Sequence, residues 1–256
     1  MKSRYRVKLD DVQMDSLNDN LLILDVGYSS PESAINSIKS AGLDGYDLDT
    51  PYADKTTVTV TFELHIYNIA ERNAACQAIN KWASEGGVLT VSDRSGQQLR
   101  DVRCEQYASI ESVRNWTDPL TIVFATTYVP YWRSASKTLN LSGKSAKGTL
   151  KMDGNIGSAP VSVNVTAEAN VTSFKIVVGS TNIELGGLAL TKGQTLVIDY
   201  VRSRYLRIRA EGKSVMNLLR PTSSDRLMAP CGANTSVSIT ANNKVTVTVS
   251  ARGMWI

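Results

Sequence analysis

The sequence predicts a mainly β protein with one principal helix and two domains. In the first half, one segment alternates apolar and polar residues and leads directly into a helical pattern. The second half consists of short alternating segments separated by Gly, Asn, Ser and Asp. The charge also changes sign, because residues 1–133 carry 13 Lys and Arg against 18 Asp and Glu, whereas residues 134–256 carry 15 against 6. These net charges of −5 and +9 place a domain boundary near residue 133.

The clearest strand of the first domain is predicted over residues 57–67, TVTVTFELHIY. Its odd positions are polar or aromatic, and its even positions are apolar. A strand with this pattern buries one face and leaves the other partly exposed. The residues expected on the buried face are Val58, Val60, Phe62, Leu64 and Ile66.

A helix is predicted over residues 69–85, directly after this strand. Asn68 is a suitable N-cap, Glu71 follows three residues later as in a capping box, and Gly86-Gly87 supplies the stop. The helix should cover the apolar side of the preceding strand. The residues expected on its buried face are Ile69, Ala75, Cys76, Ile79, Trp82 and Ala83.

Further strands of the first domain are predicted over residues 88–92, 98–110 and 119–129, with a turn at the sequence DRSG between the first two. The region from Tyr28 to Lys55 is rich in Gly, Asp and Ser, so it is expected to form a long loop.

The second domain is predicted to be a two-layered β-sandwich. Apolar residues alternate with polar ones over residues 161–165, 174–178, 206–208 and 245–249. Turn sequences such as VGSTN, TKGQ and TANNK separate these segments. Short strands at such intervals are typical of two packed antiparallel sheets.

Several classes of protein are disfavoured by the composition. The longest apolar runs, residues 21–24 and 176–178, are far too short to cross a membrane, so no membrane insertion is expected. Asp10-Asp11 falls where an export signal would carry its apolar stretch. The three cysteines form no C-x-x-C pair, and His65 is the one histidine, which leaves little basis for a disulfide framework or a zinc site.

No catalytic, cofactor or metal site is predicted. An acidic loop at residues 44–55 contains four aspartates, but it lacks the Gly and the closing Glu of an EF-hand, so a solvated loop is expected. No phosphate-binding Gly motif occurs, and no pair of carboxylates is marked as a glycosidase pair. The sequence therefore favours a protein that is not an enzyme.

A basic cluster in VRSRYLRIRA is a candidate face for contacts with a partner. It comprises Arg202, Arg204, Arg207 and Arg209. The alternation places Leu206 and Ile208 inward and the last two arginines outward, toward phosphates, teichoic acid or an acidic protein surface. The alternative is a solvated strand face, and exchanging Arg207 and Arg209 for Glu separates the two interpretations.

The aromatic end of VFATTYVPYW, residues 123–132, marks the predicted domain junction. Pro130 cannot donate to a β-ladder and so should end the last strand of the first domain. Tyr131 and Trp132 are expected to pack at the junction rather than to bind a ligand.

Taken in order, the segments of this chain resemble the distal tail protein (Dit) family of long-tailed bacteriophages. In the first domain the resemblance lies in GLDG, TVTVTFELHIY, ERNAACQAINKWASEGG, VLTV and TIVFATTYVPYW. In the second it lies in GSAPVSVNVTA, GQTLVIDY, MAPCGANTSVSI and VTVTVSARGMWI. No single motif is diagnostic, but their order and spacing extend over essentially the whole chain.

The resemblance implies a structural virion protein. Residues 1–133 would form a ring-forming domain with an extended hairpin, the belt, and residues 134–256 a galectin-like β-sandwich. Six copies would close into a hub ring that joins the tail tube protein to the tail-tip, or tail-associated lysin, protein and in many phages carries the receptor-binding protein. DNA would pass through the ring without specific binding. The protein would be assembled in the host cytoplasm and reside at the distal end of the tail.

Charge and composition bear on two further features, the channel and the alternative function. The negative charge of residues 1–133 would suit a channel through which DNA slides without sticking, since binding to DNA depends on neutralising its phosphates. The alternative function is a cell-wall or carbohydrate-binding β-sandwich module, which the fold permits. The scarcity of aromatic residues in the second domain disfavours it, because aromatic faces normally carry sugar contacts.

Overall fold

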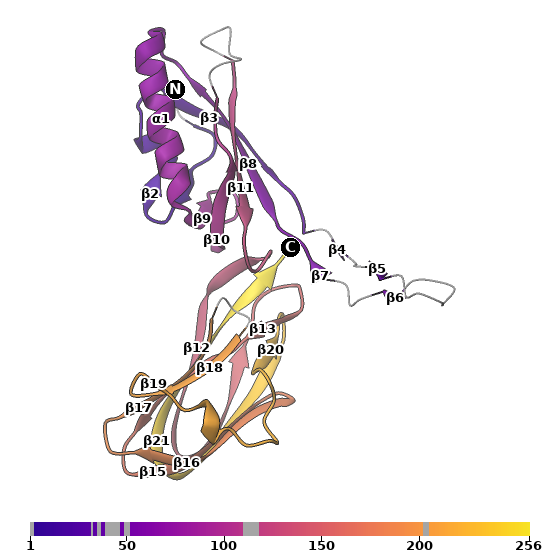
Figure 1. The fold of residues 1–256 in the computed structure, drawn as a ribbon, viewed down its shortest axis with the longest axis vertical. Helices are drawn as coiled ribbons and strands as arrows, with labels where there is room; N and C mark the ends of the chain where they lie inside the picture. The colour runs from indigo at the N-terminus through magenta and orange to yellow at the C-terminus, as the bar shows by residue number, and fades with distance from the viewer. Residues whose placement is uncertain are drawn as a thin grey trace. The chain divides into compact units, whose positions relative to one another are not determined.

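A computed structural model describes residues 3–31, 33–34, 37–38, 47–48, 52–109, 118–201 and 205–256 (Figure 1). The chain divides into two compact units, Met1–Trp132 with Ile256 and Arg133–Trp255. Both units consist mainly of antiparallel strands, and α1 (Ile69–Glu85) is the one α-helix of the residues described. The prediction of a mainly β fold with one principal helix is therefore confirmed.

The first unit is built on one antiparallel sheet. Its strands lie in the order β2 (Val12–Gln13), β1 (Val7–Leu9), β9 (Gly87–Val91), β10 (Gln97–Gln106), β11 (Leu120–Thr126), β8 (Thr57–Leu64) and β3 (Leu21–Tyr28). A short 3-10 turn, η1 (Met14–Ser16), follows β2. The sheet therefore has β3 along one of its edges and β8 and β11 in its interior.

Strand β8 has the predicted alternation. Its four apolar residues are buried and its three threonines and Glu63 are partly exposed. The strand is shorter than predicted, because the Ile66 N–H donates to the Leu64 carbonyl at 2.8 Å and turns the chain out of the ladder. The prediction that residues 65–67 continue the strand is therefore wrong.

Helix α1 has the predicted bounds. The Asn68 side-chain oxygen accepts hydrogen bonds from the amides of Ala70 and Glu71, at 2.9 and 3.3 Å, and so caps the free N–H groups of the first turn. The predicted buried face is correct except for Ile69, which is 75% exposed. The buried stripe begins one turn later, at Arg72, so the first turn projects beyond the packed part of the helix.

The core of the first unit lies between α1 and the sheet. Trp82 of the helix meets Phe124 of β11 edge to face, with the ring centroids 5.8 Å apart and the planes at 85°. Such a geometry places the positive edge of one ring on the negative face of the other. Ile79 and Phe62 are fully buried in the same unit, which gives the sheet one covered face.

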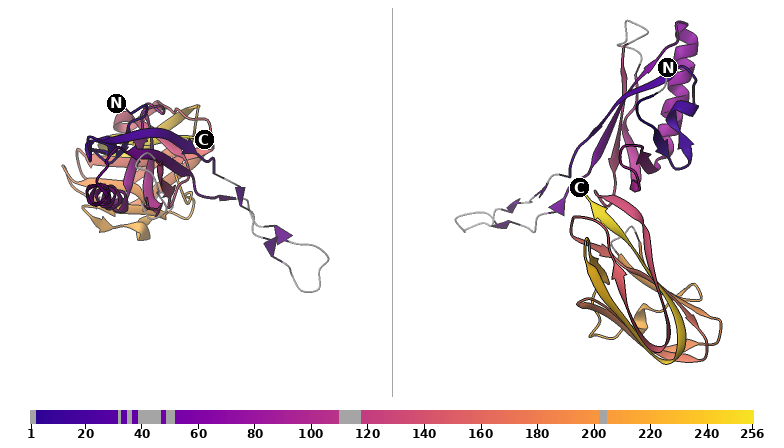
Figure 2. Two further views of the ribbon diagram at one scale, coloured as in Figure 1. Left: turned by 90° about the horizontal axis from the view of Figure 1, so that it is seen from above. Right: turned by 180° about the vertical axis from the view of Figure 1, so that it is seen from behind.

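The prediction of a long loop between Tyr28 and Lys55 is wrong for the residues described in this range. β4 (Ser33–Ala34) pairs with β7 (Tyr52–Ala53), and β5 (Ser37–Ile38) pairs with β6 (Asp47–Leu48). The first of these ladders keeps the register in which Tyr28 of β3 faces Val58 of β8, and the second is shifted by one residue. The described strands between β3 and β8 thus pair in two short antiparallel ladders, which we call the arm (Figures 1 and 2).

The second unit contains two antiparallel layers that share one strand. β15 (Val171–Val178) and β16 (Thr181–Leu190) form a hairpin, and β15 pairs with residues 237–241 of β21 (Asn234–Trp255). β14 (Ser162–Ala167), β17 (Thr195–Val201), β18 (Tyr205–Ala210) and β19 (Lys213–Ser214) follow one another, and β14 pairs with residues 245–250 of β21. The remaining elements are β12 (Trp132–Lys151), β13 (Ser158–Pro160), η2 (Met216–Leu218) and β20 (Met228–Pro230).

The predicted alternation of the second unit is confirmed. Buried apolar residues occupy every second position of β14, of residues 174–178 in β15 and of residues 245–249 in β21. In β18 Ile208 is fully buried and Leu206 is partly exposed. Each layer therefore turns one apolar face to the interior.

One close backbone approach in the second unit requires glycine. A Cβ atom on Gly253 would lie 2.2 Å from the carbonyl oxygen of Asp153 and 2.6 Å from its carbonyl carbon. Gly154, whose φ is +114°, makes a similar approach to the backbone of Met254. The end of β21 therefore lies directly against the backbone of residues 153 and 154.

Candidate interaction surfaces

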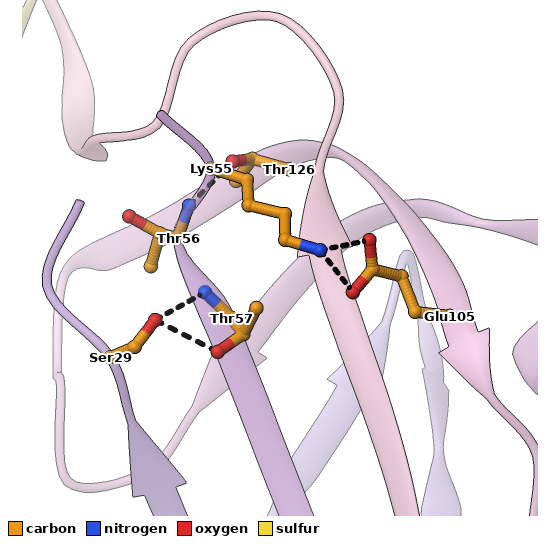
Figure 3. A network of polar contacts seen from close by, with 6 residues as sticks. All are labelled: Ser29, Lys55, Thr56, Thr57, Glu105 and Thr126. Atoms are coloured by element: carbon orange, nitrogen blue, oxygen red, sulfur yellow. Dashed lines mark hydrogen bonds and ion pairs between the residues drawn. The ribbon is translucent and has the colours of Figure 1, made fainter. Parts of the chain in front are cut away.

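The arm is fixed to the first unit by hydrogen bonds on both of its strands (Figure 3). Ser29 begins the outgoing strand, and its hydroxyl accepts hydrogen bonds from the Thr57 amide and the Thr57 hydroxyl, each at 2.8 Å. On the returning strand the Lys55 ammonium contacts both carboxylate oxygens of Glu105 in β10, at 2.6 and 2.7 Å. We call residues 28–29 and 55–57 the arm root.

Thr56 is the most deeply buried residue of the arm root, with 1% of its surface exposed. Its amide donates to the Thr126 hydroxyl and its carbonyl accepts from the Thr126 amide, both at 3.0 Å. Its own hydroxyl donates to the carbonyl of Pro130. The arm root is therefore bonded both to the end of β11 and to the chain that follows it.

An aromatic cluster lies beside these hydrogen bonds. The rings of Tyr28 and Trp132 meet edge to face, with centroids 5.6 Å apart and planes at 76°. The guanidinium carbon of Arg94 lies 4.7 Å from the centroid of each ring, and the Tyr28 hydroxyl donates to a carboxylate oxygen of Asp93 at 2.5 Å. Burial, together with the Asp93 hydrogen bond, raises the pKa of Tyr28 well above its ordinary value, so the phenol stays protonated and neutral.

The structure places the three residues expected at the domain junction as follows. Pro130 is buried and accepts the Thr56 hydrogen bond, Tyr131 is partly exposed, and Trp132 is 2% exposed in the aromatic cluster. The involvement of Tyr28 and Arg94 was not predicted. Both lie far from Trp132 in the sequence, at the end of one strand and in the DRSG turn, where no local pattern signals the contact.

Strand β3 offers a free edge for pairing with another chain. It pairs with β8 on one side, and no strand of the residues described pairs with its other side. The Ile23 amide donates to the Ser3 hydroxyl at 3.1 Å, which protects one position of the strand. Unpaired sheet edges are natural sites for strand addition.

Two large side chains at the start of α1 are strongly exposed. Tyr67 is 76% exposed and Ile69 lies in the projecting first turn. They follow the end of β8, whose last residue, Leu64, pairs with Leu21 at the start of β3. The exposed pair and the free edge therefore begin at the same end of the sheet.

Two of the four arginines in the predicted basic face are engaged within the chain. Arg207 donates two hydrogen bonds to the two carboxylate oxygens of Asp199, each at 2.7 Å, and Arg209 donates a third at 3.1 Å. Arg202 and Arg204 lie outside the residues described. Because two guanidinium nitrogens of Arg207 bind the carboxylate of Asp199, this carboxylate partly neutralises the positive charge that a partner would meet here.

The Asp199 pair makes stability depend on pH. Hydrogen bonds from Arg207 lower the pKa of Asp199 below its ordinary value, so the stabilisation is complete above the pKa of the unfolded chain and is lost as pH falls through the folded pKa. Asp199→Asn should therefore lower the stability of the second unit at neutral pH. The difference from wild type should shrink below about pH 4.

Urea unfolding at pH 7, 5 and 3 measures this difference. It should be small, because the Arg207 side chain is 42% exposed and solvent screens the pair. The control is Asp225→Asn, which changes an exposed carboxylate of the same unit. A constant difference between Asp199→Asn and wild type over all three pH values would contradict the assigned role of the ion pair.

Other polar clusters of the first unit do not converge on a metal site. His65 Nε2 lies 2.8 Å from a carboxylate oxygen of Glu63 on the polar side of the sheet. Across the described part of the chain, no three His, Cys, Asp or Glu side chains gather as metal ligands would. Of the acidic loop, Asp47 lies in β6, whereas Asp44 and Asp49 fall outside the residues described. None of the helices described here is long and apolar enough to cross a membrane.

Comparison with solved structures identifies a similar fold. The crystal structure of the Dit protein of SPP1, described as a paradigm of the hub of the adsorption apparatus in phages that infect Gram-positive hosts, superposes with a TM-score of 0.71. The match covers 97% of this chain and 98% of that one at 13% identity. The baseplate of phage p2 in its activated conformation, with Ca or with Sr, gives a TM-score of 0.48 at 9% identity over 97% of each chain. No protein-family model and no curated protein sequence matches. The likeness to the SPP1 structure shows the fold, which is thus Dit-like.

Proposed function

We propose that this chain is a distal tail (Dit) protein, a non-enzymatic structural component of the tail tip of a long-tailed phage. The observation that carries this proposal is the likeness to the SPP1 Dit protein over nearly the full length of both chains. The arm supports it, since its described ladders are two-stranded sheets separate from the main sheet of the unit. The protein would reside at the distal end of the virion tail after assembly in the host cytoplasm.

The hub would be a ring of six copies. A ring needs one heterologous interface that repeats around an axis and closes on itself. The arm and the free edge of β3 are two different surfaces of the same unit, as such an interface requires. We therefore assign the contact between copies to these two surfaces, with the tail tube protein and the tail-tip, or tail-associated lysin, protein on the two sides of the ring.

The ring would surround a channel through which DNA passes without specific binding. The polar side of β8, with Thr57, Thr59, Thr61 and Glu63, is partly exposed and carries no positive charge. These residues have no positive side chain that could neutralise DNA phosphates and so hold the DNA. We propose that this side of β8 faces the lumen; a ring map with a basic lumen would contradict it.

The second unit would contact an acidic neighbour, such as a receptor-binding protein. Its net charge of +9 over residues 134–256 supports this role. Because Arg207 is held by Asp199, exchanging Arg207 and Arg209 for Glu would add repulsion within the chain. Exchange for Gln is therefore the better test of the contact.

The ring is tested by light scattering after size exclusion and by negative-stain images. The full chain should form rings with a central hole at high concentration, since closure depends on mass action. A variant in which residues 35–50 are replaced by a short Gly turn should stay monomeric with an unchanged circular dichroism spectrum of the remaining fold.

The control for the arm variant is Lys192→Ser, in an exposed turn of the second unit, which should assemble like wild type. Rings formed equally well without the outer arm would contradict the assigned interface. A strict monomer that binds glycans would support the carbohydrate-binding module instead.

A further inference from the structure

The segment that leads from the first unit to the second has no regular structure of its own. Residues 127–131, which we call the connector, lie between the end of β11 and the start of β12 and belong to neither helix nor strand. Pro130 within it has no N–H to donate. The conformation of the connector therefore depends on contacts made to it by other parts of the unit.

Two of these contacts come from the two strands of the arm root. Thr56, on the returning strand, donates its hydroxyl hydrogen to the Pro130 carbonyl. Tyr28, on the outgoing strand, packs its ring against Trp132, the first residue after the connector. The connector and both strands of the arm thus meet in one cluster of buried or half-buried side chains.

Arg94 closes this cluster from a third direction. Its guanidinium lies at the same distance from the rings of Tyr28 and Trp132, and the neighbouring Asp93 accepts the Tyr28 hydroxyl hydrogen. A cation between two ring faces loses its best position if either ring moves. Displacement of Tyr28 would therefore also loosen Trp132, and displacement of Trp132 would loosen Tyr28.

We propose that the arm root and the connector form one coupled element. Ordering of the arm root orders the connector, and by thermodynamic reciprocity ordering of the connector stabilises the arm root to the same extent. Where the arm serves as the contact between copies, as proposed above, its engagement would order the connector, the segment that precedes Arg133. The coupling itself is a property of the single chain.

Amide hydrogen exchange on the full-length monomer at low concentration tests the proposal. Thr56→Val removes the hydroxyl bonded to Pro130 but keeps both backbone bonds to Thr126. Arg94→Met removes the cation but keeps a long apolar chain. Each variant should speed exchange in residues 127–133 about fivefold to tenfold, the effect of losing one hydrogen bond or a comparable contact on local opening.

The reverse experiment decides whether the two parts are coupled. Trp132→Leu changes only the connector side, yet it should speed exchange of the Ser29 amide, which donates to the Thr57 carbonyl at 3.0 Å, by a similar factor. Trp132→Phe should have a smaller effect in the same direction and serves where the leucine variant is too unstable. The control is Thr61→Val on β8, on the same strand as Thr57 but away from the connector, which should leave residues 127–133 unchanged.

Unchanged exchange at Ser29 in both Trp132 variants, with faster exchange in the connector, would overturn the proposal. If Trp132→Leu also speeds exchange in the middle of β8, the whole unit is unfolding. The exchange of the Ser29 amide would then be compared between wild type and Trp132→Phe. The outcome is independent of ring formation. A chain that shows the coupling but never assembles would reject the proposed function and keep this inference.

Discussion

Gly253→Ala is expected to destabilise the second unit by about 3 kcal/mol, the upper range for forcing extra atoms into a packed site. The added Cβ would overlap the Asp153 carbonyl at 2.2 Å, and that atom belongs to the backbone and cannot move aside as a side chain could. Because the chain has two units, a single unfolding curve would mix them. Hydrogen exchange of the β14 and β17 amides reports the second unit by itself.

The matched control is Gly186→Ala in β16 of the same unit. Its added Cβ would also meet atoms at 2.5 to 2.9 Å, but these belong to the guanidinium of Arg220, which lies at the end of a flexible side chain. The cost should therefore stay below about 1 kcal/mol, the ordinary range for a site that can relax. Equal costs at Gly253 and Gly186 would show that contact with backbone is not what makes Gly253 necessary.

Trp132→Ala is expected to destabilise the first unit by about 3 to 5 kcal/mol, as for other buried tryptophans. The change removes the largest fully buried side chain among the residues described, together with the ring faces that Tyr28 and Arg94 contact. Unfolding in urea, monitored by the hydrogen exchange of the β8 amides, measures the lost stability of the first unit. The second unit, followed through β14, should keep its stability.

Two further variants test whether the aromatic contacts of Trp132 cause this loss of stability. Trp132→Phe keeps an aromatic face for Arg94 and should recover more than half of the loss, whereas Tyr131→Ala, at the partly exposed neighbouring position, should cost little. A large loss for Tyr131→Ala and a small one for Trp132→Ala would mean that the connector is held by other contacts. Neither change is expected to affect a catalytic activity, since none is proposed.

The elements that the sequence predicted well are those that carry their own local signal. The alternation of β8 and the polar cap of α1 at Asn68 both act between residues close in the chain, so they are visible without any knowledge of the fold. The error at Ile69 has a different origin. Periodicity locates the stripe of a helix but not the point along the helix where its packing begins.

Strand β3 illustrates why another element was missed. A bulge between Ile23 and Asp25 shifts the register against β8, so the buried residues Leu21, Ile23 and Val26 are spaced by two and then by three positions. A strand with a bulge loses the strict alternation by which strands are recognised. The residues of the arm give no local signal, because its short ladders depend on backbone hydrogen bonds, which leave no apolar pattern in the sequence; the resemblance implied an extended hairpin but not its bounds.

The candidate interaction surfaces were predictable only in part. A proline and two aromatic residues interrupt a strand at Pro130 to Trp132, and this local signal marks a segment that the structure shows to be contacted by distant residues. The partners of Trp132 come from residues 28 and 94, and such long-range contacts require the folded sheet. Likewise, the carboxylate of Asp199 faces Arg207 across two paired strands, which single-strand alternation cannot reveal.

The sharing of β21 between the two layers of the second unit constrains the order of events during synthesis. β15 and β14 both need β21 as a neighbour, yet it follows them by more than fifty residues in the chain. Neither layer can be completed until that late strand has left the ribosome, whereas the first unit already holds all the strands of its sheet. The nascent chain would thus carry a folded first unit while the other waits, and pairings between segments so distant form slowly.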